Sequence, residues 1–62
     1  MKVEIDGKVI IVEKAPTVLR LLEKLSINKE SYLVIVNERL VTEDHRIENE
    51  DSIRLVKVVS GG

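Results

Sequence analysis

The sequence contains no cysteine, phenylalanine or tryptophan, and it has one tyrosine, one proline and three glycines. Without cysteine the chain can form neither a disulfide nor a thiolate metal site, and it has no thiol nucleophile. The hydrophobic core must therefore be built from Val, Ile and Leu. Sixty-two residues are enough for one domain, and a chain of this size buries only about 60% of the surface that its unfolded form exposes.

Long apolar runs and an excess of one charge are also missing. No segment approaches the ~20 apolar residues that span a bilayer, and the first residues, MKVEIDG, lack the apolar region of a signal peptide. Charged residues make up 34% of the chain with both signs interspersed, and the net charge is −1. We therefore expect a cytoplasmic monomer that binds neither nucleic acid nor a membrane.

Residues 1–14 (MKVEIDGKVIIVEK) predict two strands joined by a turn at Asp6 and Gly7, a pair typical of tight hairpins. In the two-residue register Val3 opposes Ile10, and opposed residues share a face of the sheet. One face of this hairpin is therefore apolar, and it carries Val3, Ile5, Ile10 and Val12.

Residues 15–28 (APTVLRLLEKLSIN) predict a helix. Thr17 follows Pro16 and is a favoured N-cap residue. Apolar residues then recur at the spacing of one helix face, namely Val18, Leu21, Leu22 and Leu25. We expect the helix to end near Ser26.

The remaining residues predict three strands. Residues 31–41 (SYLVIVNERLV) favour a strand, a turn begun by Asn37 and a short strand, and residues 42–51 form a polar connection anchored by Ile47. Residues 52–59 (SIRLVKVV) favour a final strand. Its alternation places Ile53, Leu55 and Val59 on one face and Arg54, Val56 and Val58 on the other. This order predicts an α+β fold, a mixed sheet of four to five strands with one helix packed across one face.

Few residues are candidates for chemistry. The single imidazole, His45, lies in the polar connection without partners for a metal or for general-base catalysis, so we interpret it as an exposed loop residue. The acidic residues within 48–51 lack the spacing and the glycine of a calcium loop, and Gly7 is alone in its turn. We therefore predict no catalytic residue, no metal site and no bound cofactor, and we expect that the protein is not an enzyme.

The sequence ends in Ser60, Gly61 and Gly62. Glycine has no Cβ, so the last two residues form the narrowest strip of backbone that a chain can present. Fully extended, residues 60–62 span about 10 Å. Such a strip fits a narrow channel and could present the Gly62 carboxylate to the active site of a partner. Adenylation by ATP would convert this carboxylate into an electrophile that a sulfur or amine nucleophile can attack.

The chain resembles the ubiquitin-like β-grasp sulfur carriers. The resemblance rests on the order of four segments, namely the N-terminal hairpin, TVLRLLEKL, VIVNERLV and IENEDSIRLVKVVSGG. The chain is most similar to the ThiS family of thiamine biosynthesis, and the MoaD family is related. The resemblance covers essentially the whole chain. It implies a β-grasp domain over residues 1–59 and a flexible C-terminal tail over residues 60–62.

The resemblance also implies a function. An E1-like enzyme would use ATP to adenylate Gly62, and the product would become a thiocarboxylate that donates sulfide. Gly61 and Ser60 would be required for this activation. The implied partners are the E1-like adenylating enzyme, a sulfur donor of the cysteine desulfurase or rhodanese type, and an acceptor such as thiazole synthase.

The sequence departs from the related families at two places. Glu50 and Asp51 stand where the family commonly has Gly-Asp, so we expect a different turn before the final strand. The MoaD family usually has aromatic and proline residues ahead of its Gly-Gly pair, and KVVSGG lacks them. This favours thiazole synthesis or tRNA thiolation over molybdopterin synthesis. Two alternatives stay open, namely a ubiquitin-like modifier conjugated through Gly62 to lysines and a passive β-grasp interaction domain.

The matching family segment places Val34 and Val36 inside the domain. We therefore predict a core of aliphatic side chains from the sheet and the helix, consisting of Val3, Ile5, Ile10, Val12, Val18, Leu22, Leu25, Val34, Val36, Ile53 and Leu55.

The same placement turns the alternate residues outward, onto the open side of the sheet. They form a predicted partner-docking surface, which we call the outer patch, made of Leu33, Ile35, Val56 and Val58. Contiguous apolar patches of this kind commonly mark protein–protein sites. We expect Arg54 and Lys57 to rim the patch and the activating enzyme to bind it.

Overall fold

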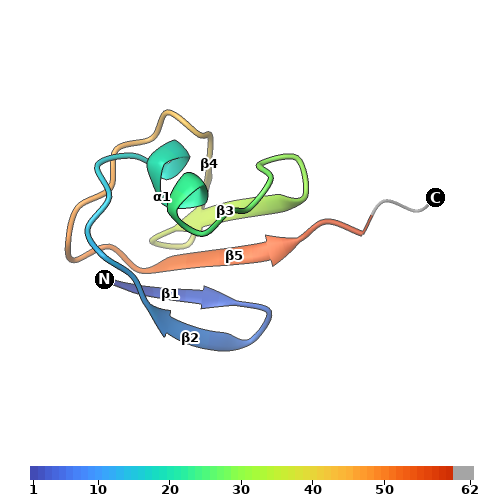
Figure 1. The fold of residues 1–62 in the computed structure, drawn as a ribbon, viewed down its shortest axis with the longest axis horizontal. Coiled ribbons are helices and arrows are strands. Elements are labelled where there is room, and N and C mark those ends of the chain that lie inside the picture. The colour runs from blue at the N-terminus through green and yellow to red at the C-terminus, as the bar shows by residue number, and fades with distance from the viewer. Residues whose placement is uncertain (60–62) are drawn as a thin grey trace.

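The computed structural model describes residues 1–59, so the predicted tail, Ser60 to Gly62, lies outside the described residues. The elements are β1 (Lys2–Ile5), β2 (Lys8–Ile11), α1 (Val18–Lys24), β3 (Tyr32–Val36), β4 (Arg39–Val41) and β5 (Ile53–Lys57). The five strands form one mixed sheet in the order β2-β1-β5-β3-β4. β1 and β5 are parallel, and the other neighbours are antiparallel. α1 packs across one face of this sheet (Figure 1), which confirms the predicted α+β, β-grasp fold.

Both hairpins turn through residues in the left-handed region. Asp6 has φ 50° and Gly7 has φ 81°, and the register of β1 with β2 is the predicted two-residue one. In the turn from β3 to β4, Asn37 has φ 52° and Glu38 has φ 67°. Two successive positive φ angles characterise the turn whose twist matches that of the flanking strands. Glu38 carries a Cβ into this conformation, which makes the second turn the more strained of the two.

α1 begins where the sequence predicts. The Thr17 hydroxyl oxygen accepts a hydrogen bond from the backbone N–H of Arg20 at 3.3 Å, as an N-cap does. The helix ends at Lys24, two residues before the predicted end, because Ser26 adopts φ 56° and cannot continue it. The buried side chains of the helix are Val18, Leu21 and Leu22.

The core lies between α1 and the sheet. Most of the predicted core residues are buried, whereas Ile5, Ile10 and Leu25 lie at its border and are half-buried. Ala15 and Leu21 are also buried, together with Ile47, the predicted anchor of the polar connection. The buried set is Val3, Val12, Ala15, Val18, Leu21, Leu22, Val34, Val36, Ile47, Ile53 and Leu55.

The final strand is shorter than predicted. β5 ends at Lys57, which pairs with Tyr32, the first residue of β3. The Val58 N–H still donates to the Ser31 carbonyl at 2.9 Å. Val59 has no strand beside it and is 86% exposed. The prediction that placed Val59 within the strand, on the face of Ile53, is therefore wrong, because β5 ends where its partner strand begins.

Leu22 tests the packing of α1 on the sheet. Its side chain is almost fully buried, so Leu22→Ala should lower the free energy of unfolding by about 2–5 kcal/mol. Leu19→Ala, on the exposed side of the same helix, is the matched control and should change it by less than about 1 kcal/mol. Urea unfolding monitored by circular dichroism measures both values. Equal effects of the two substitutions would contradict this placement of the helix.

Candidate functional site: the open sheet face and the exit of the chain

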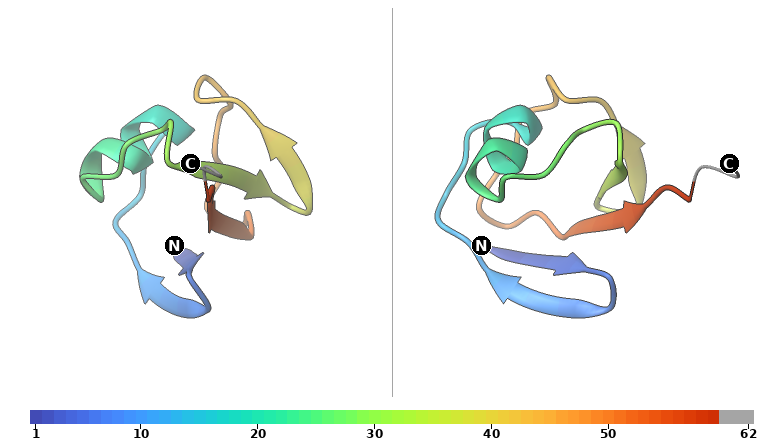
Figure 2. Two further views of the ribbon diagram at one scale, coloured as in Figure 1. Left: turned by 90° about the vertical axis from the view of Figure 1, so that its right-hand side faces the viewer. Right: turned by 45° about the vertical axis from the view of Figure 1, so that its right-hand side comes forward.

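The structure brings the four residues of the outer patch onto one face. α1 lies on one side of the sheet only (Figure 2), and the outer patch lies on the other side. Leu33 directly opposes Val56 across the β3–β5 ladder, and the two side chains are 45% and 39% exposed. Ile35 is a half-buried diagonal neighbour, and Val58 extends the patch beyond the end of β5.

Leu40 enlarges this apolar surface and was missed from the sequence. It opposes Ile35 across the β3–β4 ladder and is 66% exposed. The signal was available, because a two-residue turn at Asn37 and Glu38 sets Val36 opposite Arg39 and hence Ile35 opposite Leu40. The apolar surface of the open face therefore reaches across three strands, from β5 to the edge strand β4.

Charged residues bound the outer patch on the side of β1. Arg54 lies opposite Ile35 on β3 and beside Glu4 on β1, and its Nε is 3.5 Å from Glu4 Oε2. Both side chains are largely exposed, so this ion pair contributes little to stability. The predicted second rim residue, Lys57, is not on this face. Side chains alternate along a strand, so Lys57 shares the side of Leu55 and the core.

A second apolar region lies on the same open face at the far edge of the sheet. Val9 and Ile11 of β2 are 62% and 74% exposed. They oppose Glu4 and Lys2 of β1, respectively. This row of charged β1 side chains, continued by Arg54, separates the β2 pair from the outer patch. The open face therefore holds two distinct apolar surfaces.

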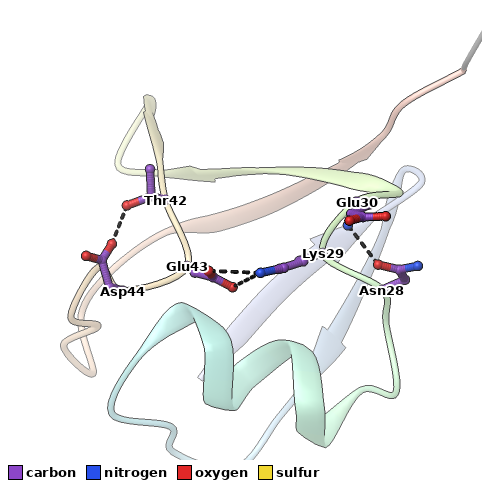
Figure 3. Close-up of polar contacts among 6 residues, drawn as sticks. All are labelled: Asn28, Lys29, Glu30, Thr42, Glu43 and Asp44. Carbon is purple, nitrogen blue, oxygen red and sulfur yellow. Dashed lines mark hydrogen bonds and ion pairs between the residues drawn. The ribbon is translucent and has the colours of Figure 1, made fainter.

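Polar contacts join the loops above α1 (Figure 3). Lys29 Nζ lies 2.8 Å from Glu43 Oε2, and this contact, chiefly through its hydrogen bond, raises the pKa of Lys29. The pair lies beside a groove of about 460 Å³ between α1 and strands β3 and β4. The Thr42 hydroxyl donates to Asp44, and this bond lowers the pKa of the Asp44 carboxyl. The first of these exposed contacts joins the loop before β3 to the connection after β4, the second lies within that connection, and neither brings a nucleophile beside a base.

His45 lies in the same connection and is exposed, as predicted. Its backbone carbonyl accepts a hydrogen bond from the Val18 N–H at 3.0 Å, so the residue helps to hold the start of α1. Within residues 1–59, no group of three His, Cys, Asp or Glu side chains is placed to hold a metal ion. In the same residues, no helix is long and apolar enough to cross a membrane.

The turn before β5 forms without the glycine that the family commonly has there. Asp51 Oδ2 accepts from the Glu48 N–H at 2.8 Å, and Asp51 Oδ1 accepts from Asn37 Nδ2 at 2.8 Å. These bonds, the backbone one above all, lower the pKa of Asp51. Glu50, at the glycine position, is not among the residues with positive φ, so its side chain causes no backbone strain. Residues 48–51 therefore form a turn that is held by its own hydrogen bonds. The bond from Asn37 connects this turn, which precedes β5, to the β3–β4 turn.

The predicted reactive residues, Ser60, Gly61 and Gly62, lie outside the described residues, and their roles stay predictions. The described chain does show where it leaves the sheet. β5 is the central strand, between β1 and β3, and its last backbone bond is the one from Val58 to Ser31. Val58 is a residue of the outer patch, and it also makes this last bond. The described chain therefore leaves the sheet beside the outer patch.

A five-stranded mixed sheet with one helix across one face defines the ubiquitin-like β-grasp class of domains. The sequence model of the ThiS family matches residues 2–62, nearly the whole chain. The chain belongs to the ThiS family, whose members are small sulfur carriers that work with E1-like activating enzymes and sulfur donors. This confirms the resemblance found in the sequence. A comparison with curated proteins found no match.

The Asp51 turn predicts a pH dependence of stability. The pKa of the Asp51 carboxyl is lowered in the folded state, so the ionised carboxylate stabilises the fold. This stabilisation is complete at a pH well above the ordinary aspartate pKa of about 3.9. It is lost as the pH falls through the lower pKa of the folded state. Asp51→Asn should therefore destabilise the protein at pH 7 and make a smaller difference near pH 2. Urea midpoints across this range test it, with Glu50→Gln as the control. A difference that does not change with pH would contradict the assignment.

The outer patch predicts which surface a partner contacts. Leu33→Glu should leave the fold intact, because the side chain is exposed, and should weaken binding to the cognate activating enzyme by about tenfold or more, as loss of a central apolar contact does. Ile11→Glu is the matched control, because it makes the same chemical change on the same face but outside the patch. Titration calorimetry with the enzyme compares the two affinities. Equal weakening by both variants would show that the outer patch is not the contact.

Proposed function

We propose that this chain carries sulfur as a thiocarboxylate at Gly62, formed after an E1-like enzyme has adenylated the Gly62 carboxylate. The observation that carries the proposal is that the match to the ThiS family extends to residue 62 and so includes both Gly61 and Gly62. The exposed apolar face beside the exit of the chain from the sheet supports it, since a carrier must present its terminus while it is held by another protein.

Activation consists of two substitutions. An oxygen of the Gly62 carboxylate attacks the α-phosphorus of ATP, pyrophosphate leaves, and an acyl-adenylate forms. Hydrosulfide, released when a thiol reduces the persulfide of the sulfur donor, then attacks the carbonyl carbon, and AMP leaves with the electrons of the broken C–O bond. Sulfur thereby replaces one carboxylate oxygen. The thiocarboxylate is a better nucleophile than the carboxylate, and it can transfer its sulfur to an acceptor.

The chain itself supplies position. Ile53 and Leu55 anchor β5 in the core, and the last described backbone bond of this region fixes Val58. Gly62 is the fourth residue after Val58, so the reacting carbon lies within about 13 Å of a fixed point. An enzyme that binds the outer patch therefore also confines the carboxylate to a small volume, and such confinement lowers the entropic part of the barrier.

Thiazole synthesis for thiamine, or tRNA thiolation, is the proposed use of the sulfur. The residues KVVSGG lack the aromatic and proline residues that typically precede the Gly-Gly pair of the MoaD family. An acceptor such as thiazole synthase would bind the same domain after activation. Conjugation to a lysine is the competing outcome of the same acyl-adenylate, because an amine can attack the carbonyl carbon in place of sulfide.

The terminal glycines can be tested separately from the fold. A chain that ends at Ser60 should keep the unfolding temperature of the full chain, because the two glycines removed have no side chain that a core could hold. It should nevertheless give no ATP–pyrophosphate exchange with the cognate E1-like enzyme, since its carboxylate is withdrawn by up to ~7 Å.

Gly62→Ala keeps the length of the chain and should slow ATP–pyrophosphate exchange by about 100-fold. Equal exchange by the full and shortened chains would refute the proposal.

A further inference from the structure

β2 is an edge strand that is short and begins with Lys8 but has no other usual protection of an edge. The order of the sheet leaves one side of Lys8–Ile11 without a neighbouring strand among the described residues. Natural edge strands commonly carry a proline, a bulge or inward-pointing charge that prevents pairing with another chain. β2 has no proline, and its register with β1 runs without a bulge. Two of its exposed side chains, Val9 and Ile11, are apolar.

The backbone groups of Val9 and Ile11 face the free edge. Met1 and Val12 exchange both of their backbone hydrogen bonds, at 2.8 and 2.6 Å, so they form a hydrogen-bonded pair of the β1–β2 ladder. Such pairs alternate with non-hydrogen-bonded pairs along an antiparallel ladder. Ile10 is therefore bonded to β1, whereas the N–H and C=O groups of Val9 and Ile11 point away from it.

We propose that a second copy of this chain pairs antiparallel with β2, so that one sheet continues through a weak two-fold dimer. A two-fold axis perpendicular to the sheet keeps the open faces together. With this symmetry the residue that meets its own copy is Val9, Ile10 or Ile11, according to the register. When Ile10 meets Ile10, each Val9 opposes Ile11 of the second copy, with two backbone hydrogen bonds in each of these pairs.

Side-chain chemistry selects this register. It opposes the two exposed apolar residues of each β2 to those of the other, and it sets Asp6 opposite Lys14 of the second copy at both ends. Centring the pair on Ile11 instead would set Lys8 opposite Lys14 and Val9 opposite Glu13. Like charges directly opposed destabilise a strand pair. Centring it on Val9 would leave Ile11 opposite Gly7.

The other edge of the sheet is less suited to pairing. β4 has three residues, and of these Leu40 alone directs its backbone groups outward, since Val36 and Arg39 flank a two-residue turn. After β4 the chain returns to the helix, where the Leu19 N–H donates to the Glu43 carbonyl at 2.8 Å. β4 therefore offers one outward residue, and β2 offers two.

The dimer is expected to be weak and to leave the carrier function free. A four-residue edge buries far less than the ~1,200 Å² of a stable interface, so we expect a Kd of the order of 0.1–1 mM. Lys2, Glu4 and Arg54 separate β2 from the outer patch, so pairing leaves that patch exposed. The sequence predicts a monomer, whereas the free edge of β2 leads us to propose a monomer–dimer equilibrium. This proposal does not depend on the proposed function.

Sedimentation equilibrium between about 0.05 and 2 mM chain tests the dimer. The average mass should rise with concentration towards that of two chains. Ile11→Glu should raise Kd at least about tenfold, because it removes an apolar pair at both ends of the contact. Leu40→Glu, the same kind of change on the opposite edge strand, should leave Kd unchanged. A single-chain mass at all concentrations, or a Kd that responds to Leu40→Glu and not to Ile11→Glu, would overturn the proposal.

Engineered cysteines test the register, because the chain has none of its own. Val9→Cys and Ile11→Cys replace exposed side chains and should fold normally. When the two variants are mixed and oxidised, the mixed disulfide should form in clear excess over both self-linked products, because only opposed Cα atoms lie within the ~4.4–6.8 Å that a disulfide spans. Ile10→Cys should link to itself. A random ratio of the three products would overturn the proposed register.

Discussion

The parallel pairing of β1 with β5 at the centre of the sheet determines the rest of this structure. It sets Val3 beside Ile53 and Ile5 beside Leu55, residues that lie some fifty positions apart in the sequence. These two strands can pair only when the intervening chain crosses the sheet, and α1 makes that crossing over the face that holds the core (Figure 1). The core is aliphatic throughout, with no buried polar side chain among residues 1–59. Burial of apolar surface and the strand ladders therefore supply most of the stability.

The same pairing separates folding from function. Because β5 is central, its inward side chains, such as Leu55, are buried beneath α1, and its outward side chain Val56 lies in the outer patch. Three of the titratable groups with shifted pKa values, Lys29, Asp44 and Asp51, lie in loops and turns, and the fourth, Tyr32, is the first residue of β3. The reactive carboxylate that we propose lies beyond all of these residues in the sequence. Substitutions on the open face can therefore change partner binding with little cost to the fold.

Local features of the sequence were sufficient to predict the elements. The turn at Asp6 and Gly7 and the cap at Thr17 are signals within a few residues, and the structure confirms them. Non-local features were harder to predict. The alternation of the last strand does not reveal where its partner begins, so Val59 was misplaced, and the strand order that leaves β2 at an edge is absent from any local pattern. The inward placement of Val34 required the family resemblance, because both faces of β3 are apolar.

The central claim is that sulfur is carried at Gly62, and mass spectrometry of the C-terminal peptide tests it most directly. The chain is incubated with its E1-like enzyme, ATP and a sulfur donor, and the mass of its C-terminal peptide is then measured. The account predicts that one sulfur atom replaces one oxygen atom at Gly62, and that omission of ATP abolishes the change. An unmodified peptide after demonstrated adenylation, or Gly62 found only in a branched peptide on a lysine, would contradict it.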